Sequence, residues 1–163
     1  FRESISFVTK WAARTLDVLQ AINEVNPTIV HFSGHGSEEN ELVFQDNEGN
    51  TKLVSKEAIV ETIVSTSDDV RLVFFSSCFS SGQAEEIVKS VDAAVGMRIE
   101  IGDDSARIFA AQFYSAIGFG HSIYKAFQQA KSALMLEGIQ EEDVPELYVK
   151  SGLDSNQLIL VQP

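Results

Sequence analysis

The sequence predicts an α/β fold in which a mainly parallel sheet is flanked by helices on both faces. The first observation behind this prediction is that short apolar strands alternate with helical segments along most of the chain. The second is that residues 28–32 and 70–76 are largely apolar, which is typical of strands buried inside a sheet. The third is a length of 163 residues with 44% hydrophobic and 22% charged side chains, which suits one globular domain.

The expected elements begin with a half-buried strand over residues 4–12, where apolar and polar residues alternate. Leucine, valine and isoleucine at helical spacing predict a helix over residues 15–23, which Asn26 and Pro27 end. The strand over residues 28–32 follows. This strand–helix–strand order implies a right-handed parallel crossover.

A hairpin is expected next, with short strands at residues 41–45 and 51–54 around a turn of aspartate, asparagine and glycine. Ser55 then caps a helix that has its apolar face within residues 58–64. That helix leads into the strand over residues 70–76, which is the second strand of the parallel sheet.

The second half of the chain predicts three helices and a further buried strand. Ser80 and Gln83 have the spacing of a capping box, which predicts the start of a helix after the cysteine. Residues 93–97 form the buried strand. An acidic loop over residues 99–104 opens a long helix, and another helix covers residues 123–136.

The composition limits the partners and the location that we expect. Twelve basic and twenty-four acidic residues give a net charge of −12, which repels nucleic-acid phosphates and anionic membrane surfaces. We therefore expect neither nucleic acid nor membrane as a partner. No apolar run approaches the roughly 20 residues of a membrane span, and no signal peptide is visible. A single cysteine excludes an internal disulfide and predicts a cytoplasmic protein.

Two reactive side chains follow the two apolar strands. His35 follows the first strand and Cys78, the only cysteine, follows the second. Because ligand sites in open α/β sheets form at the carboxyl ends of the strands, we expect these side chains to lie together. An imidazole next to a thiol favours the thiolate, and the amides of Gly36 and Cys78 could bind a developing oxyanion. These parts match acyl transfer, with amide hydrolysis as the leading case.

Structural roles compete with this chemical interpretation. A lone cysteine is often only a small buried residue, and His31 and His121 fit structural positions in a strand and at a helix start. One cysteine and three scattered histidines do not make a zinc site, and the acidic loops lack regular calcium-ligand spacing. We therefore expect no metal and no cofactor.

The ordered motifs resemble the CHAT domain, a caspase-like cysteine protease family of clan CD that is related to caspases and separases. The resemblance rests on FSGHG at residues 32–36, ELVF at residues 41–44 and FSSCFS at residues 75–80, and it continues to Gly120. It implies a caspase-haemoglobinase fold, with His35 as general base and Cys78 as nucleophile. It also implies an oxyanion hole formed by the Gly36 and Cys78 amides.

The same resemblance implies a larger context for the chain. Members of this family usually begin with a strand and a helix upstream of the strand expected at residues 4–12. We therefore expect residues 1–163 to be a single protease domain of a larger protein, lacking its first strand and helix. Relatives in bacteria are attached to sensor or repeat domains and act in defence, which implies a regulatory or sensor domain as partner.

Specificity for a protein substrate is expected from residues around the cysteine. By resemblance, Ser76 lines the first substrate pocket, where some relatives that prefer basic residues carry an acid. Glu100 lies near the position of an acid that meets arginine in separases. Asp103 and Asp104 are alternatives, although acids at a helix start usually cap the helix.

The sequence is also compatible with two other classes of function. One is a catalytically inactive caspase-like scaffold for protein–protein interaction. The other is a small-molecule binding module of flavodoxin type, for which no glycine-rich phosphate loop is present after Gly34 and Gly36.

Overall fold

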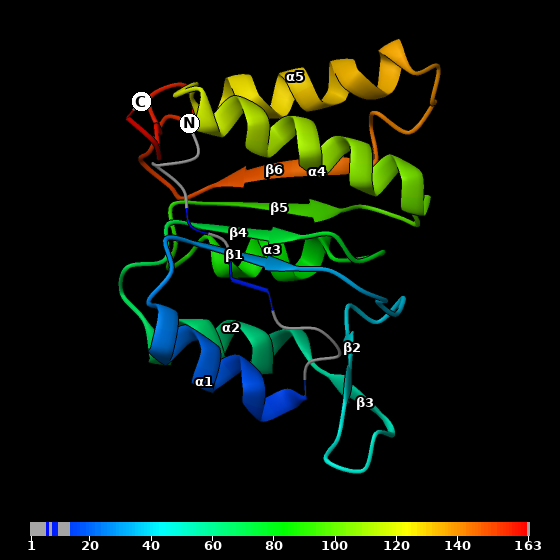
Figure 1. Cartoon of the computed structure of the whole chain (residues 1–163), viewed down its shortest axis with the longest axis vertical. Coiled ribbons are helices and arrows are strands. Elements are labelled where there is room, and N and C mark those ends of the chain that lie inside the picture. The colour runs from blue at the N-terminus through cyan, green and yellow to red at the C-terminus, as the bar shows by residue number, and fades with distance from the viewer. Residues whose placement is uncertain (1–5, 7, 10–13, 163) are drawn as a thin grey trace.

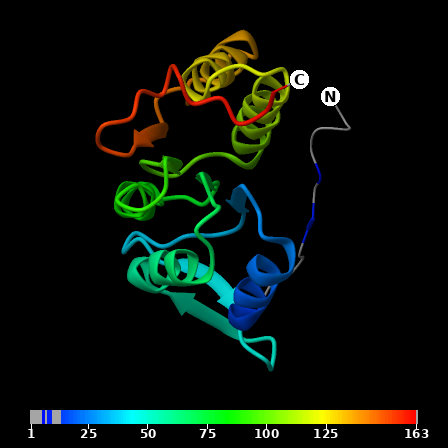
Figure 2. The ribbon, with the colours of Figure 1, turned by 90° about the vertical axis from the view of Figure 1, so that its left-hand side faces the viewer.

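The computed structural model describes residues 6, 8–9 and 14–162 of the chain. Within them, helices cover both faces of a four-stranded sheet, as Figures 1 and 2 show. The predicted α/β fold with a mainly parallel sheet is therefore confirmed. The strand expected at residues 4–12 falls almost entirely outside the described residues.

The sheet has the strand order β1-β4-β5-β6. Strands β1 (Ile29–Phe32), β4 (Leu72–Phe75) and β5 (Ala93–Met97) are parallel, and β6 (Pro145–Val149) pairs antiparallel with β5. Every residue of β4 and β5 is buried, which explains why the sequence of these strands is apolar without interruption.

A separate hairpin consists of β2 (Leu42–Gln45) and β3 (Thr51–Val54), as the sequence predicts. The side chain of Asp46 accepts hydrogen bonds from the amides of Glu48 and Asn50 and so shapes the turn. These hydrogen bonds, first of all the one from Asn50, hold the pKa of Asp46 below its usual value. The hairpin directly follows the loop that carries His35.

Five helices are described: α1 (Thr15–Val25), α2 (Lys56–Thr66), α3 (Ser81–Ile87), α4 (Asp103–Gly118) and α5 (Ile123–Leu136). Two of these helices, α2 and α5, begin with a serine N-cap whose side chain accepts a hydrogen bond. Ser55 accepts a hydrogen bond from the Ala58 amide at 3.2 Å, and Ser122 accepts one from the Lys125 amide at 3.1 Å.

The sheet separates two hydrophobic cores because side chains alternate between its faces. On one face, Leu72 and Phe74 pack with α4 and α5. On the other face, Val73 and Phe75 pack with α1, α2 and α3. Figure 1 shows α4 and α5 above the sheet and α1 and α2 below it.

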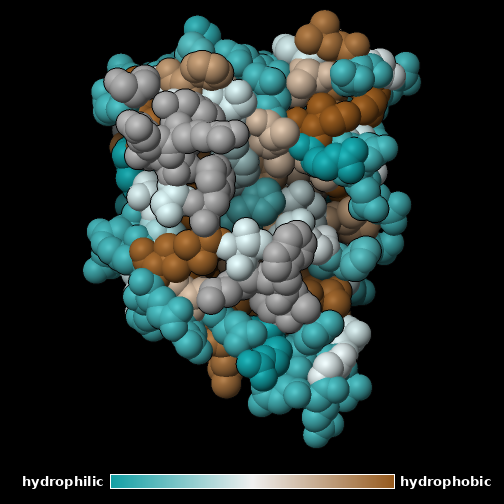
Figure 3. Space-filling view, viewed as in Figure 1, coloured by the Kyte–Doolittle hydropathy of each residue, from teal (hydrophilic) through white to brown (hydrophobic). Residues whose placement is uncertain are grey.

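The surface is mainly polar on the face drawn in Figure 3, with hydrophobic residues scattered between hydrophilic ones. Isolated exposed apolar residues are normal on a folded protein. Among the described residues, no helix is both long enough and apolar enough to cross a membrane.

Candidate active site

His35 and Cys78 occupy equivalent positions after neighbouring strands. Phe32 ends β1 and pairs with Phe75, which ends β4, and each reactive residue follows its strand end by three positions. The Ser76 amide donates a hydrogen bond to the Phe32 carbonyl at 2.8 Å, so the two strands stay paired up to the loops. Both residues therefore leave the sheet at its carboxyl-terminal edge.

The loop with His35 lies directly against the backbone of Cys78. A Cβ atom built on Gly36 would lie 2.2 Å from the Cys78 carbonyl oxygen, which is closer than any side chain can approach. Only glycine permits this contact. Gly36 thus brings the histidine loop and the cysteine loop together.

The histidine loop is held by the hairpin that follows it. The Val43 amide donates to the His35 carbonyl at 3.0 Å, and Gly36 lies opposite Leu42 in an antiparallel bridge. The His35 residue is exposed, and its imidazole forms no hydrogen bond within the described part of the chain. The ring is therefore available to a substrate or to the thiol.

The sulfur of Cys78 contacts the backbone of Ile101. The Ile101 amide donates to Sγ at 3.4 Å, and the thiol can donate to the Ile101 carbonyl at 3.7 Å. Cys78 is only partly buried. The loop that leads into α4 therefore lies directly against the sulfur.

The backbone after Cys78 is fixed by Ser80, which is fully buried. Its hydroxyl lies 2.6 Å from the Ser77 carbonyl oxygen and 3.2 Å from that of Phe75, and it accepts from the Met97 amide at 3.0 Å. The predicted capping box of Ser80 and Gln83 is therefore wrong, because both side chains bond to groups outside the helix.

Two amides next to the cysteine are free to bind an oxyanion. Among residues 14–162, neither the Gly36 amide nor the Cys78 amide donates a hydrogen bond to another protein group. Phe79, the next residue, has a φ of 56°, which is a strained conformation for a bulky side chain. Strain of this kind is common where a loop presents groups for chemistry.

The residues expected to bind substrate come from the end of β4, from the loop after β5 and from the start of α4. Ser76 ends the paired region of β4 and is half-buried. Glu100 is exposed and adjoins Ile101, the residue that contacts the sulfur. Asp103 is exposed in the first turn of α4, and Asp104 forms an ion pair with Arg107 at 2.8 Å.

Glu141 is a residue of this region that the sequence does not reveal. Its carboxylate accepts from the Gly102 amide at 2.9 Å and from the Ser105 hydroxyl at 2.8 Å. It therefore holds the loop that carries Glu100 and Ile101. No local pattern could show this, because Glu141 lies 39 positions from Gly102.

The surroundings of the other two histidines, His31 and His121, indicate structural roles. His31 stacks on Phe74 with ring centroids 4.8 Å apart, and its Nδ1 lies 2.7 Å from the Tyr114 hydroxyl. Desolvation lowers the pKa of His31 to about 4, and burial raises the pKa of Tyr114 above its usual value. His121 follows α4, and its amide donates to the Ala116 carbonyl at 3.2 Å. Among the described residues, no three side chains of metal-binding type are grouped together.

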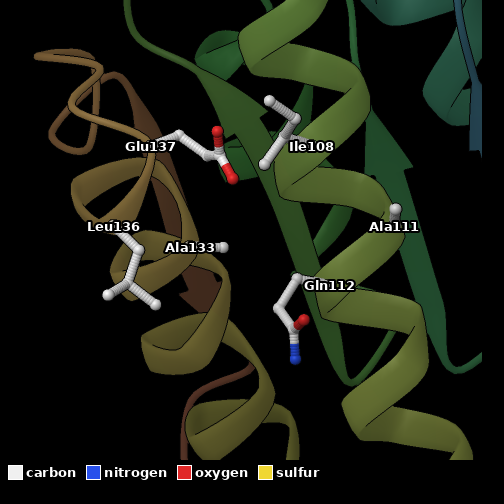
Figure 4. A pocket seen from close by; sticks show the side chains of 6 residues that line it. All are labelled: Ile108, Ala111, Gln112, Ala133, Leu136 and Glu137. Atoms are coloured by element: carbon white, nitrogen blue, oxygen red, sulfur yellow. The ribbon is translucent and has the colours of Figure 1, made fainter.

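A separate hollow lies between the two long helices (Figure 4). It has a volume of about 410 Å³ and is lined only by α4 and α5 together with Glu137, which caps α5. Ile108 and Gln112 line it on α4, and Ala133 and Leu136 line it on α5. None of these residues belongs to the loops around Cys78.

Comparisons with known proteins agree with this architecture. The CHAT domain family matches residues 2–145 of the chain. A "Roc-COR-CHAT protease" from an unknown prokaryotic organism is 27% identical over 133 residues, which cover 78% of this chain and 12% of that protein. The chain thus spans only a small part of that relative.

A solved structure shares the fold. It is a secreted C11 cysteine protease from Bacteroides thetaiotaomicron in complex with an irreversible peptide inhibitor. The TM-score is 0.56 at 14% sequence identity, and the match covers 82% of this chain and 44% of the other. The family match and the shared fold lead to one conclusion: this chain belongs to the CHAT domain family and has the caspase-like fold of clan CD cysteine proteases.

Proposed function

We propose that this chain is a caspase-like cysteine endopeptidase that cleaves a protein substrate with His35 and Cys78. The observation that carries the proposal is the contact of Gly36 with the Cys78 carbonyl, which brings the two loops together at one sheet edge. The free amides of Gly36 and Cys78 add the second requirement of amide hydrolysis, a site for the oxyanion.

The mechanism follows from the chemistry of these groups. His35 accepts the thiol proton of Cys78, and the thiolate attacks the carbonyl carbon of the scissile bond. The carbonyl oxygen becomes an oxyanion that the two amides bind. When the carbon–nitrogen bond breaks, the His35 imidazolium protonates the leaving amine. A water molecule that gives its proton to His35 then hydrolyses the thioester and releases the thiol.

The loop that carries Glu100 and Ile101 supplies the specificity in this proposal. The Ile101 amide donates to Sγ, and its neighbour Glu100 is exposed beside it. In the proposed complex, Glu100 pairs with a basic side chain that precedes the cleaved bond. In the same proposal, Ser76 lines this pocket, and Asp103 is an alternative acid to Glu100.

Regulation by another domain belongs to the same proposal. The chain matches 12% of a relative whose name includes two further parts, Roc and COR. We expect an attached or partner sensor domain to switch on the protease in the cytoplasm, in a defence response.

The inactive scaffold is a second candidate because of one observation. The Cys78 thiol contacts Ile101, whereas the His35 imidazole forms no hydrogen bond within residues 14–162. A scaffold would need no contact between the two side chains. A protease would form that contact when substrate or an activating partner binds.

The test uses the full-length natural protein with candidate activating signals and a mixed peptide library. Cys78→Ala and His35→Ala should each lower cleavage by about 10³-fold or more, whereas His121→Ala should leave it unchanged. Glu100→Gln should lower cleavage after basic residues by about tenfold relative to other sites. If no activator gives cleavage and a peptide-like electrophile does not label Cys78, the scaffold becomes the better explanation.

A further inference from the structure

Gln83 connects the histidine loop with the helix that follows the cysteine. It lies in α3 and is fully buried. Its Nε2 donates a hydrogen bond to the Asn40 carbonyl at 2.5 Å, across 43 positions of sequence. We call this hydrogen bond and the surrounding packing of Asn40 on Gly82 and Gln83 the Asn40 clamp.

Gly82 adds steric contact to the Asn40 clamp. A Cβ atom built on Gly82 would lie 2.7 Å from Oδ1 of Asn40, so the asparagine side chain rests directly on the α3 backbone. Asn40 has a φ of 59°, a conformation that asparagine tolerates better than most residues. The loop is thus shaped to reach α3 at this point.

The turn between Gly36 and Leu42 transmits the position of Asn40 to His35. The Asn40 amide donates to the Ser37 carbonyl at 3.1 Å, and the Ser37 amide donates to the Glu41 carbonyl at 2.9 Å. Gly36 pairs with Leu42 at the base of this turn. A shift of Asn40 would therefore move Gly36 and the neighbouring His35.

The other end of the Asn40 clamp is fixed relative to Cys78. Gln83 follows Cys78 by five positions, and the fully buried Ser80 ties the intervening backbone to Met97 and Phe75. The clamp therefore joins two segments, one of which carries His35 and the other Cys78.

We propose that Gln83 is a positioning residue that sets the imidazole of His35 relative to the sulfur of Cys78 by holding Asn40. The inference rests on the proposed function, because it gives Gln83 a role in placing His35 and Cys78 of that protease. Gln83 is fully buried and bonds to Asn40, so in this proposal it acts through the histidine loop.

A substitution at Gln83 can test positioning without a large loss of stability, because only one of the two polar atoms of its side chain has a hydrogen-bond partner. Its Oε1 is the buried side-chain polar atom without a hydrogen-bond partner in the described part of the chain. Gln83→Met keeps a side chain of similar length and removes both a hydrogen bond and a buried unsatisfied acceptor. These two effects on stability oppose each other. The change in melting temperature should therefore be small.

The experiment measures the pH dependence of Cys78 alkylation by iodoacetamide in the full-length protein, together with kcat and KM. In the wild type with the activating signal added, pairing with the imidazole should allow alkylation at a lower pH than in His35→Ala. Gln83→Met should shift this profile upward towards that of His35→Ala. Its kcat should fall by roughly 10- to 100-fold with little change in KM.

Gln112→Met is the matched control, because Gln112 on α4 donates to Gln129 at 3.2 Å, away from both loops. It should leave the alkylation profile and kcat unchanged. Gly82→Ala is the second variant for the case in which Gln83→Met does not fold. It displaces Asn40 without altering Gln83 and should shift the profile in the same direction.

The outcomes separate this inference from the proposed function. If His35→Ala changes the profile but Gln83→Met and Gly82→Ala both match the wild type, the positioning role is wrong and the protease proposal stands. If the wild type itself alkylates like a free thiol and Cys78→Ala still cleaves, both are wrong. An upward shift together with a lower kcat in folded Gln83→Met supports the positioning role.

Discussion

At the scale of single residues, His31 shows how neighbours decide what a histidine can do. It lies on β1 only four positions before His35. One face of its ring packs on Phe74 and its Nδ1 lies beside the Tyr114 hydroxyl, although the residue as a whole remains exposed. Desolvation among these rings lowers its pKa to about 4, so it stays neutral where enzymes usually operate. It is therefore unsuited to carry a proton near neutral pH.

This pKa predicts a dependence of stability on pH. Between pH 6.5 and about 4, an unfolded His31 binds a proton and the folded one does not, so protonation favours unfolding. The free energy of unfolding should thus be unaffected by His31 above pH 6.5. Below that, the His31 effect should lower it as the pH drops to about 4. Because the residue is partly exposed, we expect a contribution of only about 1 kcal/mol.

The measurement is urea unfolding of the wild type and His31→Asn at pH 7.5 and pH 4.5. The free energy of unfolding should fall less in His31→Asn than in the wild type, because asparagine can bond to Tyr114 without titrating. Equal losses in both proteins would show that carboxylates alone cause the acid sensitivity.

At the scale of elements, the contact between α3 and β5 positions the cysteine loop. Gly96 in β5 lies under the start of the helix. A Cβ atom at this position would lie 2.7 Å from the Ser80 carbonyl oxygen and 2.9 Å from Cα of Ser81. Because both are backbone atoms, a larger side chain can be accommodated only if the helix moves.

Gly96→Val should therefore destabilise the protein by about 1–3 kcal/mol and lower its melting temperature by several degrees. Gly102→Ala is the control, because its new Cβ would meet only side-chain atoms of Glu141 and Ser105, at 3.2 Å and 3.5 Å. Thermal unfolding followed by circular dichroism measures both. A loss in Gly102→Ala as large as that in Gly96→Val would contradict the steric explanation.

The elements also show what the sequence could predict and what it could not. Apolar runs predict β4 and β5, because a strand that is buried on both faces is apolar over a few consecutive residues. Chain order predicts that His35 and Cys78 follow neighbouring strands. The roles of Ser80 and Gln83 could not be predicted, because the Met97 amide that bonds to Ser80 and the Asn40 carbonyl that bonds to Gln83 lie 17 and 43 positions away. Their capping-box spacing was a local pattern, and non-local hydrogen bonds replaced it.

At the scale of the whole molecule, β4 joins the two hydrophobic cores. Phe74 packs with Phe109 and Phe113 beneath α4, with ring centroids 6.1 Å and 5.4 Å away. Its neighbour Phe75 points to the opposite face and stacks on Phe32 at 5.4 Å. Both are fully buried. The central strand therefore couples the helical layers on the two faces.

This coupling predicts that the described fold unfolds as one unit. Phe74→Ala and Phe75→Ala each remove a buried aromatic ring, and each should cost about 3–5 kcal/mol. They form a matched pair, because they are adjacent residues of one strand that face different cores. Since neither core can keep its sheet face without β4, both variants should lower the melting temperature by a similar amount, in a single transition.

Differential scanning calorimetry of both variants measures this, with the calorimetric and van't Hoff enthalpies compared in each. Two separate transitions in either variant would mean that the α4–α5 layer and the α1–α2–α3 layer melt independently. Independent melting would also mean that the proposed site is not held rigidly, because His35 and Cys78 follow β1 and β4, which lie between these layers. A single transition in both variants supports a site whose two loops are held by the entire sheet.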